Sequence, residues 1–127
     1  MGLDNGIVIR AKKNTLSKIC KDLHITNDHQ NLEIAYWRKC WNLRNDILDA
    51  IYPDWHNNEL YEYPITKENF NSLLDVLITY LKPDPWEDLD RYENYIDSQQ
   101  HYCQIVNRLD ELFYKYPDIK VYFYDSY

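Results

Sequence analysis

A short acidic loop carries the residue types that general acid–base chemistry requires. In YPDWHNNEL, Asp54, His56 and Glu59 surround Trp55, and a carboxylate beside an imidazole can move protons near neutral pH. Carboxylates are abundant in this chain, so their proximity alone does not indicate an active site. We therefore interpret the segment as an ordinary turn with an exposed tryptophan.

Metal binding and nucleophilic catalysis find little support in the sequence. The residue types that bind metals gather in one polar segment, at Asp22, His24, Asp28 and His29. The two histidines are five positions apart, a spacing that does not place them on one helix face, and no paired cysteines accompany them. The three cysteines are widely spaced, and two glycines are too few for a phosphate-binding loop. We predict no metal, no cofactor and no catalytic residue.

The stretch EIAYWRKCWNLRNDILDAIY combines aromatic rings with positive charge. From Trp37 onward, apolar residues recur with the period of a helix that ends before Pro53. We interpret Trp37 and Trp41 mainly as part of a wide buried helix face. The alternative is that Trp37, Trp41 and Arg44 bind a small, nucleotide-like anion by stacking and charge neutralisation. Arg44 lies at the edge of the apolar band, where its stem can cover the rings or its head can contact an anion or a partner.

A second aromatic segment is strongly acidic. Residues 84–97 contain six acids and one arginine, interleaved with tryptophan and tyrosine. Carboxylates beside aromatic anchors are suited to docking on a basic protein surface. The predicted partner-binding residues are Trp86, Asp88, Asp90, Tyr92 and Glu93.

The formal net charge of −7 is unevenly distributed. Residues 1–40 hold seven Lys or Arg against four Asp or Glu, and the remaining 87 residues hold seven against seventeen. An acidic chain repels phosphate backbones, so we expect no direct nucleic-acid binding but a basic protein surface as partner, such as that of a nucleic-acid-binding protein. No stretch approaches the roughly 20 apolar residues of a membrane span. We expect a cytoplasmic protein, without membrane contact, whose thiols stay reduced.

The local patterns predict a single α+β domain over residues 1–127, with a small, mainly antiparallel sheet of about three strands and three or four helices packed on it. A β-branched run after an Asn-Gly turn signal predicts a first strand at Leu3–Arg10. Alternating residues predict two more strands, at Leu60–Ile65 and at residues 119–127. Pro64 favours an edge position for the second of these strands. Residues 33–37 fit a strand or the start of a helix.

The clearest helix signals lie in the second half of the chain. Thr66 is placed as the N-cap of a helix that reaches about Leu81. Asp84 begins a long helix that runs to about Tyr114. Because a straight helix of that length would span about 45 Å, we expect a kink around Asp97–Gln100, where polar residues interrupt the apolar stripe.

Several separated pieces share an order with known proteins. The chain opens with MGLD, continues with Tyr-Trp-Arg-Lys at residues 36–39, leads an aromatic strand into a helix in YEYPITKENFNSLLDVL, and closes on YFYDSY. In these pieces it resembles a family of small, uncharacterised bacteriophage and prophage proteins, in which Tyr-Trp-Arg-Lys begins a helix. The chain departs from that pattern after Lys39, with Cys40, Trp41 and Arg44 where a small residue, an Asn and later a His are expected. The resemblance implies a phage origin and a location in the bacterial host cytoplasm.

Charge, aromatic content and the resemblance together predict a non-enzymatic phage protein that binds a host or phage protein through an acidic–aromatic surface. We expect an inhibitor of a host defence system, such as an anti-CRISPR protein. The alternatives are the small-molecule binder described above and a small hydrolase. The many tyrosines favour a homodimer formed through Val121–Tyr124 or through the long helix. Asp4 is expected to hold the aromatic helix in place through Arg38 or Lys39.

Overall fold

The computed structural model describes residues 2–26, 31–81 and 89–127, with side chains described from residue 96 onward in the last range. The elements are β1 Asp4–Arg10, α1 Lys13–Leu23, β2 Leu32–Arg38, α2 Trp41–Ile51, η1 Pro53–His56, β3 Glu62–Ile65, α3 Phe70–Thr79, α4 Leu89–Asn107, α5 Leu109–Lys115 and β4 Lys120–Ser126. This order confirms the predicted α+β class.

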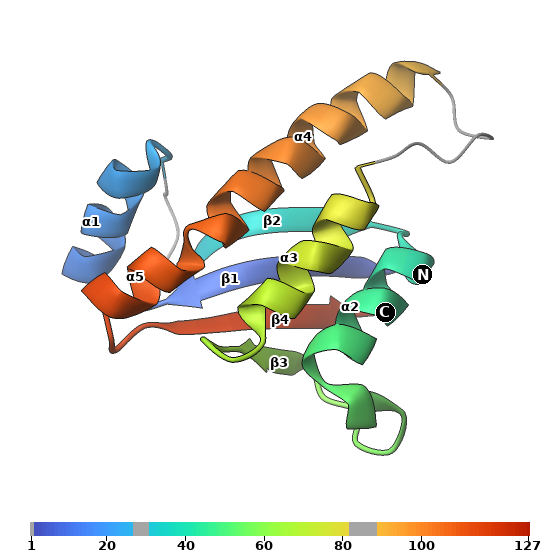
Figure 1. Ribbon diagram of the computed structural model, residues 1–127, viewed down its shortest axis with the longest axis horizontal. Helices are drawn as coiled ribbons and strands as arrows, with labels where there is room; N and C mark the ends of the chain where they lie inside the picture. Colours follow the sequence, from blue (N-terminus) through green and yellow to red (C-terminus); the bar gives the residue numbers. More distant parts are fainter. Residues whose placement is uncertain (1, 27–30, 82–88) are drawn as a thin grey trace.

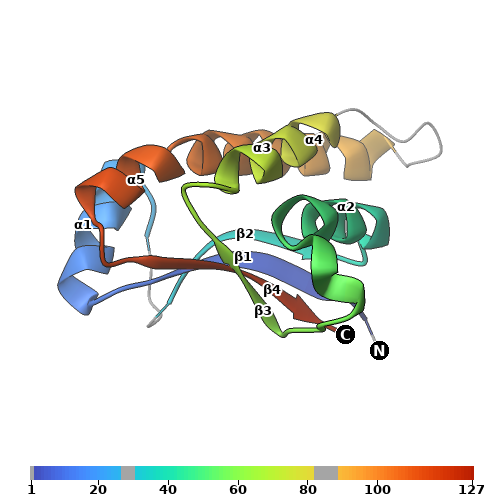
Figure 2. The same cartoon turned by 60° about the horizontal axis from the view of Figure 1, so that its bottom comes forward.

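One antiparallel sheet organises the described part of the chain. Its strands lie in the order β2-β1-β4-β3, so the sheet has four strands rather than about three. Helices α2, α3, α4 and α5 cover one face of this sheet, and α1 packs at one end (Figures 1 and 2). On that face the strands bury alternate side chains: in β4, Val121, Phe123 and Asp125 point inward while Tyr122 and Tyr124 point to the other side.

The aromatic stretch divides between a strand and a helix, so the prediction of a helix from Trp37 onward is wrong. Trp37 belongs to β2, and α2 begins at Trp41. Between them, Lys39 adopts a φ of 58°, a left-handed conformation that no α-helix can contain. The apolar stripe itself is confirmed from Leu43 to Ile51, the residue at which the helix ends before Pro53. The prediction that Trp41 belongs to the buried face is wrong, because its side chain is half exposed.

The helix predicted from Thr66 begins with a capped turn. The Thr66 hydroxyl accepts a hydrogen bond from the Glu68 amide (3.2 Å), and the Asn69 side chain accepts one from the Thr66 amide (2.7 Å). These bonds satisfy amide groups that precede the first helical turn. The N-cap of the regular α-helix is therefore Asn69, three residues later than predicted, and the helix runs from Phe70 to Thr79.

The long C-terminal helix is bent, as predicted, but at another place. The region of the expected kink, residues 97–100, is continuous helix, and the break lies at Arg108 between α4 and α5. Gln99 explains the difference because it is fully buried, accepting a hydrogen bond from Trp37 Nε1 and donating one to the Leu77 carbonyl. A satisfied polar group can lie on the buried helix face without interrupting it. The predicted helix start at Asp84 lies outside the described residues.

Two further predictions concern the sheet. Pro64 lies in β3 at the edge of the sheet, as expected. Strand β4, in contrast, is paired with β1 on one side and β3 on the other, so Val121–Tyr124 cannot join two copies by strand pairing. Asp4 contacts the Tyr36 hydroxyl across the sheet at 2.5 Å; it therefore ties β1 to β2 and does not hold a helix through Arg38 or Lys39.

Candidate functional site

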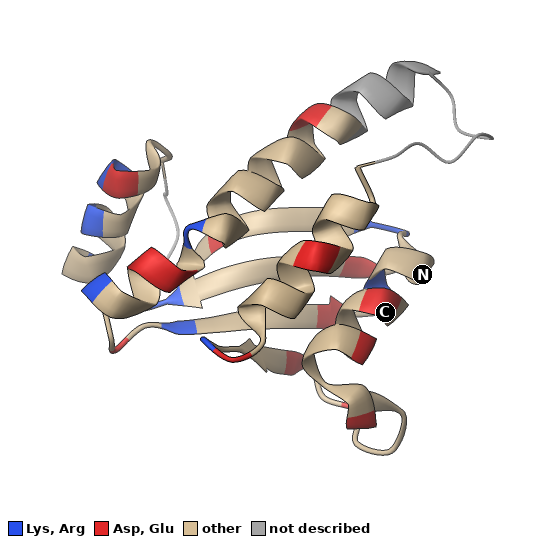
Figure 3. Cartoon of the chain, viewed as in Figure 1, with Lys and Arg blue, Asp and Glu red and all other residues tan. Residues whose placement is uncertain are grey.

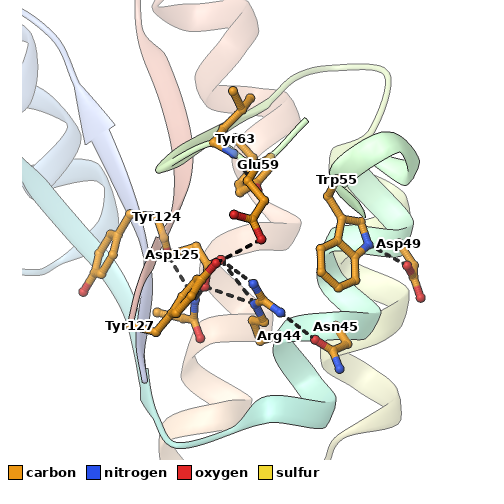
Figure 4. Close-up of polar contacts among 11 residues, drawn as sticks. Arg44, Asn45, Asp49, Trp55, Glu59, Tyr63, Tyr124, Asp125 and Tyr127 are labelled. Carbon is orange, nitrogen blue, oxygen red and sulfur yellow. Dashed lines mark hydrogen bonds and ion pairs between the residues drawn. The ribbon is translucent and has the colours of Figure 1, made fainter. Parts of the chain in front are cut away.

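A buried ion pair joins helix α2 to the end of strand β4. Arg44 is 7% exposed and Asp125 is 4% exposed. The Arg44 guanidinium donates to Asp125 through Nε (3.1 and 3.2 Å) and Nη2 (2.7 Å), and through Nη1 to Asn45 Oδ1 (2.9 Å) (Figure 4). Burial opposes the charge of Arg44, but the hydrogen bonds and charge of Asp125 outweigh it and keep the pKa of Arg44 above its ordinary value. Arg44 therefore keeps its positive charge at neutral pH.

Asp125 is held from a second side. The Asn5 amide donates to Asp125 Oδ1 at 2.8 Å and to the Tyr124 carbonyl at 3.2 Å. The Asp125 amide also donates to the Tyr61 carbonyl at 2.8 Å. Strand β1 and helix α2 therefore meet at the Asp125 carboxylate, and the segment before β3 meets its backbone amide, which makes Asp125 the organising residue of this region.

Aromatic rings surround the Arg44 guanidinium. Its central carbon lies 4.8 Å from the ring centroid of Trp55, 5.3 Å from that of Tyr127 and 5.7 Å from that of Trp41, distances typical of cation–π contacts. Figure 4 shows Arg44 between Tyr127 and Trp55. Trp55 is buried and donates to Asp49 at 2.8 Å, so the prediction that it is exposed is wrong. The buried charge thus fixes the positions of three rings.

Two of these rings extend to the protein surface. Trp41 is 48% exposed and Tyr127 is 57% exposed, and their ring centroids are 6.1 Å apart. The Tyr127 hydroxyl bonds Glu59 at 3.1 Å, next to Leu60 and Tyr61, which are also exposed apolar side chains. We call Trp41, Leu60, Tyr61 and Tyr127 the aromatic patch. Neither the pocket of about 270 Å³ beside α1 nor that of about 180 Å³ between β2 and α4 is lined by its residues.

The elements that carry the aromatic patch also carry exposed carboxylates, at Asp46 and Asp49 on α2, Asp54 in η1 and Glu59 beside Leu60, and Glu59 contacts the patch itself through Tyr127. Their hydrogen-bond donors are neutral: Tyr80 for Asp46, Trp55 for Asp49, Asn57 and Asn58 for Asp54, and Tyr127 for Glu59. Within the described residues, the ion pairs involve other acids, at Asp22, Glu62, Glu111 and Asp125. Acidic residues mark α2 and α3, while lysines mark α1 at the far end (Figure 3). Among the described residues, no ion pair therefore neutralises these four carboxylates, and their charge favours a positively charged partner.

The structure brings together only part of the predicted ligand-binding set. Trp41 and Arg44 are neighbours, but Trp37 is buried in β2, where it contacts the Tyr102 ring edge-on (centroids 5.3 Å apart) and bonds Gln99. Trp37 therefore belongs to the core. Because Asp125 and Asn45 already accept hydrogen bonds from Arg44, this geometry favours internal pairing over capture of a free anion.

The predicted acidic anchor lies largely beyond what the structure describes. Trp86 and Asp88 fall outside the described residues, and Asp90, Tyr92 and Glu93 belong to α4 but their side chains are not among those described. That site stays a prediction.

The residues considered for catalysis form no common site. The His56 ring contacts the Trp55 ring (centroids 3.7 Å apart), while Asp54 accepts hydrogen bonds from Asn57 and Asn58. Among residues 2–26, 31–81 and 96–127, no group of three or more metal-ligating side chains occurs. Burial raises the pKa of the Cys20 and Cys103 thiols, which disfavours the reactive thiolate.

Tyrosine–carboxylate contacts recur across the molecule and make stability sensitive to alkaline pH. Hydrogen bonds to Asp4, Asp22 and Glu59 raise the pKa values of Tyr36, Tyr116 and Tyr127, and burial is the main cause of the rise in Tyr80, Tyr102 and Tyr124. Unfolded tyrosine has a pKa of about 10. A tyrosine whose pKa is higher in the folded protein stabilises the fold fully below about pH 10, and this stabilisation is lost as the pH rises through the folded-state pKa.

We therefore expect the free energy of unfolding to fall steadily above about pH 10. Denaturant titrations at increasing pH measure this fall, and the ultraviolet absorbance of tyrosinate should rise late, together with unfolding. Complete ionisation of the tyrosines near their ordinary pKa in a still folded protein would contradict the prediction.

Comparison with known proteins supplies no relative: no family model, no curated protein and no solved structure matches this chain. Among the described helices, none is long and apolar enough to cross a membrane.

Sequence reasoning identified Trp41 and Arg44 but not the residues that surround them in the structure. Asp125, Asn5 and Tyr127 were not singled out, although one signal was present. In the last strand, Asp125 lies two and four positions after Phe123 and Val121, and side chains two apart share one face of a sheet. The spacing therefore places a carboxylate on the buried face. An arginine in the apolar stripe of α2 was its natural partner.

Proposed function

We propose that this chain is a non-enzymatic protein that binds a basic protein surface through the aromatic patch and the carboxylates around it. One observation carries the proposal: exposed rings beside a buried ion pair share their elements with exposed carboxylates that form no ion pair among the described residues. Interfaces draw most of their binding energy from a few fixed aromatic side chains, and flanking charge accelerates encounter with an oppositely charged partner.

The resemblance to small bacteriophage proteins suggests the setting. In a bacterial host cytoplasm, proteins with exposed basic grooves are those that bind nucleic acids. We infer that the partner is a nucleic-acid-binding protein of a host defence system, and that the aromatic patch with its carboxylates occupies the groove that nucleic acid would otherwise fill.

Replacing Trp41 with alanine tests this proposal. Because Trp41 is half exposed and supplies the largest ring of the patch, we expect the affinity for the partner to fall by about 30-fold, as for a hot-spot loss of about 2 kcal/mol. The partner is isolated from bacterial lysate on immobilised protein and identified by mass spectrometry. Its binding is then measured with both proteins purified, at low and high salt.

The matched control is Tyr114→Ala. Tyr114 is 85% exposed and lies on α5, so its loss should leave binding unchanged. A partner that binds Trp41→Ala as tightly as the unchanged protein, or whose affinity is insensitive to salt, would overturn the proposal.

A further inference from the structure

The face of the sheet opposite the helices carries a second set of tyrosines. Among the described elements, none covers this face (Figure 2). Tyr36, Tyr122 and Tyr124 point to it from β2 and β4, according to their register with Gly6 and Val8 of β1. The Tyr124 ring lies so close over Gly6 that an added Cβ would be 2.5 Å from it. Glycine at this position lets a ring lie flat on the sheet.

The charges on this open face are balanced, unlike those of the whole chain. Register places six charged residues on it: Asp4, Arg10, Glu33, Arg38, Glu62 and Lys120. Three are acidic and three are basic, whereas the chain carries a net charge of −7. Two copies of an acidic protein repel each other along most surfaces, and a neutral face is the one on which they can approach.

The arrangement of these charges is also self-complementary. Asp4 begins β1 and Arg10 ends it, about 20 Å apart at 3.3 Å per residue. A twofold axis that crosses the middle of the strand sets Asp4 of each copy against Arg10 of the other. Both groups can form a further hydrogen bond or ion pair. Among the contacts described, Asp4 accepts one hydrogen bond, from the Tyr36 hydroxyl, and the Arg10 side chain, although paired with Glu62, is 41% exposed.

We propose that the open face of the sheet binds a second copy of this chain, with the tyrosines at the centre and the charges at the rim, as in other protein interfaces. The face measures about 20 Å by 23 Å from strand spacing and length. That footprint is small for a protein interface, so the dimer forms at high protein concentration. The two aromatic patches stay available in the dimer because they use other residues.

Analytical ultracentrifugation over a wide concentration range tests the inference. The average mass of the unchanged protein should rise from 15.6 kDa toward twice that value. Lys120→Glu gives each face a net charge of −2 and should stay monomeric. Lys18→Glu changes the charge of the chain equally but lies on α1, and it should dimerise like the unchanged protein. Both lysines are exposed, so neither change threatens the fold.

A mixing experiment tests the orientation of the two copies. Asp4→Arg and Arg10→Asp should each be monomeric alone, because like charges then face each other, while an equimolar mixture should dimerise because both contacts become complementary. Rescue by mixing cannot arise from a folding defect. A protein that is monomeric at all concentrations, a Lys120→Glu variant that dimerises normally, or a mixture of folded variants that remains monomeric would overturn the proposal.

Discussion

Replacing Arg44 with methionine is expected to lower the free energy of unfolding by about 3–5 kcal/mol. The change leaves the Asp125 carboxylate buried without its cation, and only the Asn5 amide and its neighbouring backbone remain near it. An unpaired buried charge costs far more than the pair contributes. Equilibrium denaturation of the purified variant measures the loss.

Two comparisons separate this effect from a general loss of charge. Lys115→Met breaks an exposed ion pair with Asp22 and should cost far less than Arg44→Met, because exposed ion pairs contribute little to stability. Combining Arg44→Met with Asp125→Leu removes both buried charges and should recover most of the stability. If Arg44→Met were no more destabilising than Lys115→Met, Arg44 would not be the organising cation of this region.

The two neighbouring tryptophans are expected to behave in opposite ways. Trp37→Ala should cost about 3–5 kcal/mol of stability, because it empties a buried site between β2 and α4 and leaves the Gln99 side chain without its donor. Trp41→Ala should change stability by less than about 1 kcal/mol, as for most surface positions. Denaturation curves of the two variants, recorded in parallel, provide the test.

A milder variant isolates the hydrogen bond of Trp37. Trp37→Phe keeps a ring in the core but removes the indole N–H, so Gln99 alone loses a partner, at a cost of about 1–3 kcal/mol. Equal losses for Trp37→Ala and Trp41→Ala would contradict the division of this stretch into a core strand and a surface helix start.

The stretch from Glu33 to Tyr52 contains apolar residues that fit a helical period as well as a strand. For this reason Trp37 was wrongly assigned to a helix. A β-bulge shifts the register between Ile7 and Val8, so Ile34 and Ala35 of the facing strand are both buried. The bulge removes the alternation by which a strand is recognised. The left-handed turn at Lys39 gave no sequence signal either, because the residue is not glycine.

Other elements followed directly from local patterns. The β-branched run in β1, the alternation in β4, the edge position of Pro64 and the apolar stripe of α3 all predicted their elements. The sequence predicted only part of the site: it indicated Trp41 and Arg44 but not Asp125. Arg44 and Asp125 are 81 positions apart, and their contact depends on the order of the strands in the sheet. Likewise, no local pattern reveals that the rings of Tyr127 and Trp41 lie against each other.

The position of β4 has a consequence for how the molecule is assembled. The strand comes last in the sequence, yet it lies between β1 and β3 and delivers both Asp125 and Tyr127 to the region of Arg44. The sheet therefore closes only after all other strands have been synthesised, through contacts of long sequence separation that form slowly. A binding partner that recognises the aromatic patch would thus discriminate between completed molecules and partly folded chains.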